Sequence, residues 1–349
     1  MVINFKKVKE TMKMFNKSRM AWTISALFLV AVTSCSKDEP AEQSPSADQI
    51  FFTGEQAGLT VKSALIPNNS DFVADAGSTL KTTLVGNVTW WTQTTDKTGI
   101  YSPEARDATS GSGTQIINNV YTADNTAAST SFTATPPMYW GAASTPHNFY
   151  AYYPFTGGSP AAGTIPIALP STQTQSAAND FTHIGGGVTP LDFLVATPIL
   201  VNSPANTLQT YHPLVHLVYN HVFTIVEFDI VGSGAPLNAI QLRGTALALA
   251  GAFIDIKQST PTPGVAYSLA GQGSKADAVI VKLTAPATLS LSIVTKVYMV
   301  IYPGFAGTCN IDFSFDSGST WKNAVSKTAP SGGFLRGQKY VVAVDAGTL

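Results

Sequence analysis

Residues 214–230 read Leu-Val-His-Leu-Val-Tyr-Asn-His-Val-Phe-Thr-Ile-Val-Glu-Phe-Asp-Ile, and this stretch decides the fold class. β-branched and aromatic residues dominate it and Pro213 precedes it, a pattern that favours a strand over a helix. Further runs of the same texture, separated by Gly, Pro, Asn and Ser clusters, occupy residues 58–63, 148–153, 246–256, 278–283, 297–302, 309–315 and 340–345. No stretch keeps helical periodicity over three turns with capping signals at both ends.

One of these runs is ambiguous, because residues 246–250 read Ala-Leu-Ala-Leu-Ala and also suit a helix. Gly244 and Gly251 flank it and favour a strand. Many short strands with turn signals between them are typical of a β-sandwich or of another closed all-β fold. We therefore expect an all-β chain with two tandem β-sandwich domains, residues 48–205 and 206–349. The polar, Pro-containing residues 201–210 are the best candidate for the linker between them.

Composition excludes two classes of protein. The chain has 349 residues, of which 44% are apolar and 12% are charged, with a net charge of −1. That apolar content without a high net charge excludes a disordered chain. Residues 35–349 hold 14 basic and 20 acidic residues, so nothing there would neutralise nucleic-acid phosphates, and no nucleic-acid partner is expected.

The N-terminus resembles a targeting segment. Six Lys and Arg residues precede the uncharged residues 21–32, a run too short to cross a hydrocarbon core of ~30 Å. We therefore expect a signal peptide at residues 1–34, with Met1, Met14 or Met20 as its start. Val-Thr-Ser-Cys at 32–35 resembles the bacterial lipobox, which implies cleavage before Cys35 and lipid attachment to Cys35. The alternative is an ordinary secreted protein with a chance cysteine.

The residues after Cys35 suggest where the chain goes. Ser-Lys-Asp-Glu at 36–39 is similar to the acidic export tag of surface lipoproteins in the Bacteroidetes. The alternative is a solvated linker, because residues 35–47 are polar and rich in Pro and Ser. A lipidated Cys35 leaves Cys309 alone, so no intramolecular disulfide is possible. Cys309 is expected to be a small buried apolar residue.

Catalytic constellations are sparse. Glu104, Asp107 and Glu227 are the candidates for a carboxylate pair, but their spacing gives no reason to prefer a pair over solvated residues. His212, His216 and His221 lie on or next to one expected strand. Residues four apart on a strand are too far from each other to bind one metal ion, and residues five apart point to opposite faces. Nucleophile-elbow and phosphate-loop motifs are missing from the sequence. We expect no enzyme activity, no metal and no cofactor.

Aromatic residues leave one binding hypothesis open. Trp90 and Trp91 are adjacent, so on a strand one side chain points inward and the other outward. An outward tryptophan would offer a stacking platform for a glycan, which Trp140 and the tyrosines at 150, 152 and 153 would extend. The interpretation preferred here is that these side chains pack in the core and at its rim.

The aromatic segment also carries a resemblance. Trp140 followed by Asn-Phe-Tyr-Ala-Tyr-Tyr-Pro-Phe at 148–155 is similar to the Ala-Tyr-Tyr-Pro segment of the Bacteroidales fimbrillin-like proteins, the type V pilins. Other segments follow in the family's order: Trp91, Asp96 and Ile100-Tyr101, Asn118-Asn119-Val120-Tyr121, residues 192–196, 219–221, 226–230 and 298–303, and Leu335-Arg336-Gly337-Gln338-Lys339-Tyr340. One departure is that Gly99 precedes Ile100 where the family has a glycine after the isoleucine.

The resemblance implies a fold and a function. It implies two transthyretin-like β-sandwich domains, display at the outer membrane and cell surface in the fimbrium, and a role in cell adhesion without catalysis. In this family a trypsin-like protease removes the N-terminal segment of a lipid-anchored precursor, and the vacated groove accepts a neighbour's strand. The implied partners are other pilus subunits, outer-membrane lipid through acylated Cys35, and host or bacterial surface ligands. His221 is then expected to be a structural histidine.

The expected cleavage site departs from the family. Its cut commonly follows Arg in a Thr-Arg-Ala-like segment, whereas residues 60–63 here read Thr-Val-Lys-Ser, and the first Arg after Cys35 is Arg106. The resemblance therefore implies either cleavage after Lys62 by a Lys-cutting enzyme or no cleavage. The alternative function is a glycan-binding surface lipoprotein of a polysaccharide-uptake system, with Trp90 and Trp91 as its platform.

Overall fold

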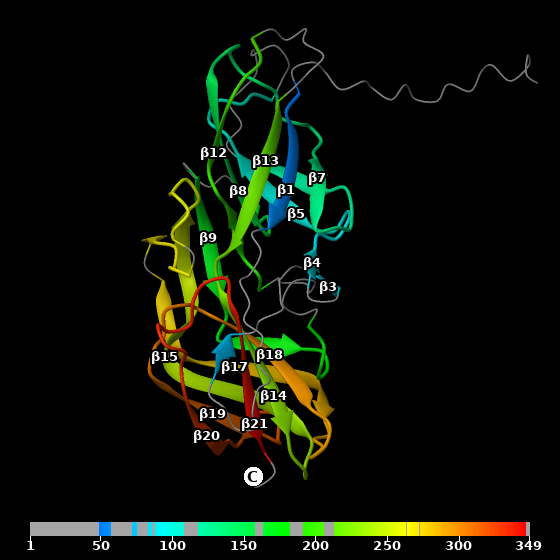
Figure 1. Cartoon of the computed structure of the whole chain (residues 1–349), viewed down its shortest axis with the longest axis vertical. Helices are drawn as coiled ribbons and strands as arrows, with labels where there is room; N and C mark the ends of the chain where they lie inside the picture. The colour runs from blue at the N-terminus through cyan, green and yellow to red at the C-terminus, as the bar shows by residue number, and fades with distance from the viewer. Residues whose placement is uncertain are drawn as a thin grey trace, which may run out of the picture. The chain divides into compact units, whose positions relative to one another are not determined.

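All of the named secondary-structure elements in the described part of the chain are β-strands (Figure 1). The structure is a computed structural model and describes residues 49–56, 72–74, 83–85, 88–107, 118–157, 163–181, 191–205, 213–262, 264–271 and 273–346. All of these residues belong to one compact unit, 47–349. None of them forms a helix long and apolar enough to cross a membrane. The predicted all-β class is confirmed.

The first sheet has eight strands in the order β11-β13-β1-β7-β6-β5-β8-β12. β11 also pairs with β8, so the ladder of strands returns on itself. Only the pairing of β1 with β13 is parallel. The strands are β1 (Phe51–Gln56), β5 (Lys97–Tyr101), β6 (Asn119–Ala123), β7 (Ser129–Thr133), β8 (Pro146–Tyr153), β11 (Leu194–Ala196), β12 (Ile199–Asn202) and β13 (Leu214–His221).

Alternation places the core on one face of this sheet. In β13 the side chains of Val215, Leu217 and Tyr219 are buried, whereas those of Leu214 and His216 are exposed. Successive residues of a strand point to opposite faces, so every second side chain enters the interior. The interior is rich in aromatic rings from several strands, and its largest fully buried side chains include Phe52, Trp91, Tyr121, Phe149, Tyr153 and Tyr219.

Two further sheets face each other. One contains β10-β17-β15-β19-β20, with β9 and β16 also paired to β15, and the other has the order β18-β14-β21-β2. Their strands are β2 (Val73–Ala74), β9 (Thr164–Leu169), β10 (Thr172–Gln175), β14 (Thr224–Val231), β15 (Leu237–Asp255), β16 (Leu269–Gly271), β17 (Ser274–Ala287), β18 (Thr295–Ile301), β19 (Thr308–Ser314), β20 (Lys322–Thr328) and β21 (Lys339–Asp345). A short hairpin joins β3 (Thr83–Val85) to β4 (Val88–Trp90).

β14 is buried on both faces. Its Val226 and Phe228 pack into the core shared with β15, β17 and β19. Its Ile225, on the opposite face, packs into a second core that also holds Ile254 of β15. A strand covered on both sides carries apolar residues on both faces, here Ile225 on one and Val226 and Phe228 on the other. Residues 214–230, predicted as one run, are thus two strands in different sheets, separated at residues 222–223.

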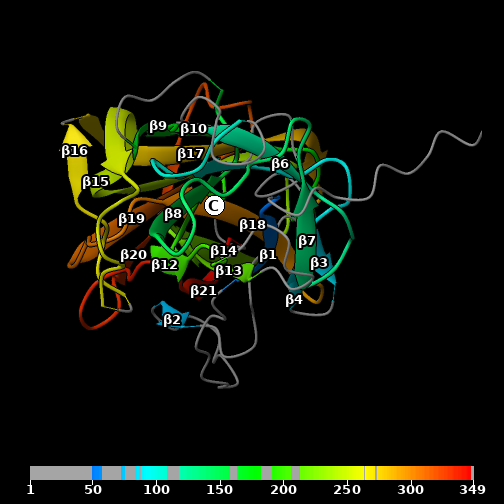
Figure 2. The ribbon, with the colours of Figure 1, turned by 90° about the horizontal axis from the view of Figure 1, so that it is seen from above.

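Strands on either side of the predicted domain boundary share sheets. β9 and β10 pair with β15 and β17 (Figure 2), β13 pairs with β1, and β2 pairs with β21. Every one of these pairings joins a strand before residue 205 to a strand after residue 206. The polar segment at 201–210 marks a break between strands, and such a break does not specify which sheet each strand joins. The division into domains 48–205 and 206–349 stays a prediction.

Candidate functional site: the β1 slot

β1 lies between two strands that are distant in sequence (Figure 1). It runs parallel to β13, with Phe51 opposite Leu214, and antiparallel to β7, with Phe52 opposite Phe132. We call its place between β13 and β7 the β1 slot. β13 and β7 do not pair with each other, and among the described strands β1 is the one that pairs with both.

The inward face of β1 is apolar. Ile50, just before the strand, and Phe52 are each 1% exposed. The Phe52 ring meets the rings of Tyr121 and Phe149 edge to face, with centroids 4.9 Å and 5.4 Å away. The Ile50 amide donates to the carbonyl of Met138 at 2.9 Å. Fully burying a phenylalanine contributes about 1.5–3 kcal/mol, so Phe52 is a main anchor of β1 in its slot.

The next inward position on β1 is residue 54. It is a glycine, and the rings of two aromatic side chains lie directly against it. A Cβ atom at Gly54 would lie 2.6 Å from Cε2 of Phe132 and 2.9 Å from Cε2 of Tyr219. Trp91 packs edge to face against both of those rings, at 5.1 Å and 5.2 Å. The Tyr219 hydroxyl is hydrogen-bonded to Thr98 at 2.7 Å. The rings are thus fixed from behind, and the slot accepts no side chain at this position.

The outward face of β1 carries Phe51 and Thr53, which are half-buried, and Glu55, which is exposed. His216 lies beside two side chains of β1, with Nδ1 3.0 Å from Oγ1 of Thr53 and Nε2 3.4 Å from Oε1 of Glu55. Ion pairs that are this exposed contribute about 0–1 kcal/mol. The hold on β1 therefore comes from the backbone ladder and from its inward face.

An empty β1 slot would be a strand receptor. Without β1, the facing edges of β13 and β7 would expose unpaired N–H and C=O groups beside the apolar site of Phe52. A segment in extended conformation satisfies both edges when it places a large apolar side chain at the Phe52 position and glycine at the Gly54 position. The chemistry of the site is thus backbone pairing with side-chain selection at alternate positions.

Buried polar pairs occupy several of the motif positions. The Tyr153 hydroxyl donates to Oδ1 of Asp96 at 3.0 Å, and the Thr92 amide donates to Oδ2 at 2.6 Å. His221 Nδ1 lies 2.7 Å from Oδ1 of Asp192, and both side chains are buried. Buried polar groups must find partners, so these pairs hold the ends of strands and loops in register.

Arg336 connects β13 to the loop that precedes β16. Its Nη1 donates to the carbonyl of His221 at 3.0 Å, and its Nε donates to the carbonyl of Val265 at 2.7 Å. Its guanidinium lies 4.8 Å from the centroid of the Tyr267 ring. Only 5% of Arg336 is exposed. The motif at residues 335–340 therefore supplies a buried arginine that links these two segments by hydrogen bonds.

A model of the fimbrillin-like family matches residues 82–348, which is most of the chain. The chain belongs to the fimbrillin-like family. The predicted family is thereby confirmed, together with the fimbrial character that it implies. A search of curated proteins found no match.

Several solved structures are similar to this fimbrillin-like chain. A candidate cell adhesion protein from Bacteroides uniformis is 17% identical, with a TM-score of 0.48 over 73% of this chain and 88% of that chain. One from Bacteroides ovatus is 14% identical, with a TM-score of 0.48 over 86% and 92%. The fimbrial anchor protein Mfa2 from Porphyromonas gingivalis is 10% identical, with a TM-score of 0.34 over 80% and 82%.

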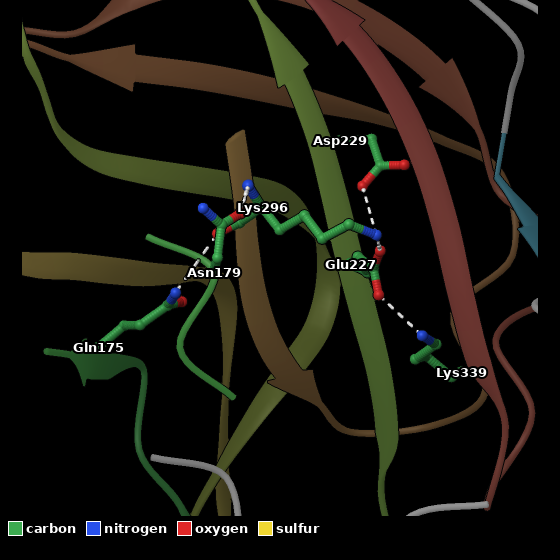
Figure 3. A network of polar contacts seen from close by, with 6 residues as sticks. All are labelled: Gln175, Asn179, Glu227, Asp229, Lys296 and Lys339. Carbon is green, nitrogen blue, oxygen red and sulfur yellow. Dashed lines mark hydrogen bonds and ion pairs between the residues drawn. The ribbon is translucent and has the colours of Figure 1, made fainter. Parts of the chain in front are cut away.

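A second polar cluster of this fimbrillin-like fold lies on β14 (Figure 3). Glu227 is 3% exposed and receives Nζ of Lys339 at 2.7 Å and, from the other side, Nζ of Lys296. Lys296 Nζ also lies 3.4 Å from Oδ1 of Asp229. Burial raises the pKa of Glu227, but Lys339 and Lys296 outweigh it, so this pKa lies below its usual value. Glu227 is therefore a charged, buried centre.

Asp229 differs from Glu227, and a pH-dependent prediction follows. Burial, and then the charge of Glu227, raise the pKa of Asp229 to about 6. A carboxyl whose pKa is higher in the folded than in the unfolded state costs stability as the pH rises through that range. Asp229→Asn should therefore be neutral near pH 4 and stabilising by about 1–2 kcal/mol at pH 8. Urea unfolding at the two pH values measures this, and a loss of stability at pH 8 would contradict it.

The predicted glycan platform loses one of its two residues. Trp91 is 0% exposed and packs against Phe132, Tyr153 and Tyr219, so it cannot stack on a ligand. The side chain of Trp90 is outside the described part of the structure, and so are Cys35 and Lys62. Trp140 is also buried, at 2% exposure.

The candidate catalytic and metal-binding residues have separate partners. Glu104 accepts hydrogen bonds from the amide and the side chain of Asn148, at 2.9 Å and 3.0 Å. His216 is exposed and His221 is buried, as opposite faces of one strand require, while His212 is outside the described residues. In the part of the chain that the structure describes, no three His, Cys, Asp or Glu side chains gather as metal ligands would.

Sequence reasoning missed the strand that fills the slot. The expected first strand was 58–63, which is outside the described residues, whereas the strand observed is β1 at Phe51–Gln56. Phe51 and Phe52 gave a weak signal for it, because only two of its six residues are large and apolar. Gly54 interrupts the pattern and reads as a turn residue.

Proposed function

We propose that this chain is a lipid-anchored fimbrial subunit of the cell surface, which joins a neighbour by exchanging the strand in the β1 slot. Family membership supports the fimbrial role, and the geometry of the slot supports the route of assembly. Acylated Cys35 would hold the precursor at the outer membrane, and the assembled fimbrium would carry cell adhesion to host or bacterial surface ligands. In this proposal the chain is structural and has no enzymatic role.

The observation that carries the proposal is the position of β1 in the chain and in the sheet. β1 follows the predicted linker 35–47 and precedes the predicted cleavage site after Lys62. A cut there would leave β1 attached to the body by contacts alone, which are the ladder to β13 and β7 and the burial of Phe52. A neighbour's strand supplies the same ladder, so exchange requires no new kind of contact.

Glycan binding is the alternative function, and one of its two residues has a different role. Trp91 forms part of the aromatic wall behind Gly54, through its contacts with Phe132 and Tyr219. The proposal thus gives Trp91 a role in shaping the β1 slot.

Limited proteolysis tests the proposal. The full chain, purified in mild detergent, is treated with a Lys-specific protease and examined by mass spectrometry and negative-stain microscopy. We expect cleavage after Lys62, followed by filaments or a detergent-resistant ladder of oligomers, because the freed β1 is displaced by a strand of another copy.

The matched control is Lys62→Gln, which removes the cleavage site and leaves every described contact of β1 in place. It should remain monomeric under the same treatment. Cleavage after Lys62 with β1 released and no assembly would contradict strand exchange. A Lys62 that stays protected from every Lys-specific protease would contradict maturation at this site.

A further inference from the structure

β18 is the edge strand of its sheet, yet its outer edge is not open. β14 pairs with one side of β18 along its full length. On the other side, alternate residues Lys296, Tyr298 and Val300 direct their backbone N–H and C=O groups away from β14. Such a row of groups is what a strand from another chain would bind.

Two glutamine side chains from β10 cover most of this row. Gln173 makes a double contact with Val300, since its Oε1 accepts from the amide at 3.0 Å and its Nε2 donates to the carbonyl at 2.6 Å. Gln175 Oε1 accepts from the Tyr298 amide at 3.0 Å, while its Nε2 donates to the carbonyl of Ala177 at 2.7 Å and lies 3.4 Å from the carbonyl of Lys296. The Gln173 amide thus repeats the pattern of a peptide group in a ladder, and the Gln175 amide supplies mainly the acceptor half of that pattern.

Asn179 completes the cover at the start of β18 (Figure 3). Its Oδ1 accepts from the Lys296 amide at 2.9 Å, and its own amide donates to the Lys296 carbonyl at 2.9 Å. Asn179 has a φ of 63°, a left-handed conformation that asparagine tolerates better than most residues. We call Gln173, Gln175 and Asn179 the amide cap.

The pairing of β10 in its sheet positions the two glutamines of the amide cap. β10 pairs in parallel with β17. Because residues two apart on a strand point to the same face, the side chains of Gln173 and Gln175 lie on one face of β10. They are 2% and 0% exposed, whereas Thr172 and Thr174 on the other face are exposed. Burying two glutamines without partners would be costly, and here both side-chain oxygens accept from β18, while Nε2 of Gln173 donates to β18 and Nε2 of Gln175 donates to Ala177.

We propose that the amide cap keeps the β18 edge of this chain from accepting a strand of another copy. The closed edge itself stands on the contacts above. Its consequence, that β18 does not compete with the β1 slot for a strand of another copy, rests on the proposed function.

The strand that the cap excludes is β18 of a second copy. Its sequence, Thr-Lys-Val-Tyr-Met-Val-Ile, is rich in β-branched and aromatic residues and suits strand pairing. Two copies related by a twofold axis at Tyr298 would pair antiparallel, with Lys296 opposite Val300. A lysine on an edge strand normally discourages pairing. Here Glu227 and Asp229 engage the Lys296 ammonium, so its charge is compensated and the cap must do the excluding.

The test removes the amides and keeps the size of the side chains. Methionine matches glutamine in length and forms no comparable hydrogen bonds, so the variant is Gln173→Met with Gln175→Met in the full chain. We expect faster hydrogen exchange at the Tyr298 and Val300 amides in the monomer, and self-association at least about tenfold tighter by sedimentation, with those amides protected again in the dimer. The matched control is Gln241→Met on β15, which should leave both readouts unchanged.

Two outcomes would overturn the proposal. The first is fast exchange at Tyr298 and Val300 in a variant that stays monomeric, and the second is an unchanged exchange rate at these amides. If the double variant does not fold, Gln173→Met alone frees only the Val300 groups and is read by the same two measurements. The Lys62 cleavage test is independent, so failure of strand exchange at the β1 slot and failure of the amide cap give different results.

Discussion

Gly54→Val will keep β1 out of its slot and lower the free energy of unfolding by about 3 kcal/mol. The first added atom, Cβ, would lie 2.6 Å from the Phe132 ring and 2.9 Å from the Tyr219 ring. Neither ring has room to withdraw, because Trp91 packs against both and Thr98 holds the Tyr219 hydroxyl. Overpacking of a fixed site costs more than overpacking of one that can relax.

The measurement compares Gly54→Val with Thr53→Val in the full chain. Thr53 is the neighbouring residue, faces outward, and loses only its hydrogen bond to His216 when it becomes valine, so its change should stay below about 1 kcal/mol. Gly54→Val gains β-propensity while Thr53→Val changes it little, so propensity opposes the predicted loss and the difference between the variants is a lower bound on the effect of the inward face. Urea unfolding gives the free energies, and hydrogen exchange of the β13 amides reports whether β1 is seated.

An open slot has a functional readout as well. If Gly54→Val expels β1, a synthetic peptide of residues 49–56 with the natural glycine should bind the variant and restore the protection of the β13 amides. The wild-type chain, whose slot is filled, should not bind the peptide. A Gly54→Val chain as stable as wild type, with β13 protected, would show that the rings do move and that glycine is not required.

The fold class is readable from residues 214–230 because their chemistry suits only extended chain. Their division into β13 and β14 is not readable, because Val222 and Phe223 at the break are as apolar as the strands around them. Period-two alternation assigns faces, as it did for His216 and His221, but it carries no information about which strand lies alongside. The parallel pairing of β13 with β1 depends on contacts between residues 51–56 and 214–219.

The same limit applies to the site. Glycine is required at position 54 because the rings of Phe132 and Tyr219, which are distant in sequence, lie against it. The local sequence, a glycine shortly after two phenylalanines, does not predict this requirement. Gln173 and Gln175 stand among serines and threonines and read as a polar loop. The motif positions were more informative, because Asp192 and His221, or Glu227 and Lys339, come from separate motifs and meet as buried pairs. Cys35 and Lys62 stay predictions.

Glu227→Met should destabilise the fold by about 3 kcal/mol at neutral pH. Methionine keeps the length of the side chain but leaves Lys339, which is buried, without its carboxylate. Breaking a buried ion pair by removing one partner costs far more than the pair contributes over an apolar pair. Lys296 is less affected, since 40% of its side chain is exposed and Asp229 remains beside it.

The double variant Glu227→Met with Lys339→Met separates these two costs. It removes both charges, so we expect it to be more stable than Glu227→Met alone, with a coupling energy of about 2 kcal/mol in the cycle. Equal losses in the single and double variants would contradict a coupled pair.

The pH dependence adds an independent check. The pKa of Glu227 is below its usual value in the fold, so its contribution is present above the unfolded pKa, about 4.3, and is lost as the pH falls through the folded pKa. The penalty of Glu227→Met should accordingly shrink in acid. This is the opposite trend to Asp229→Asn, whose stabilising effect grows as the pH rises through about 6. The pKa values of two carboxyls two residues apart on β14 are therefore shifted in opposite directions, because two lysines lower that of Glu227 while burial and the charge of Glu227 raise that of Asp229.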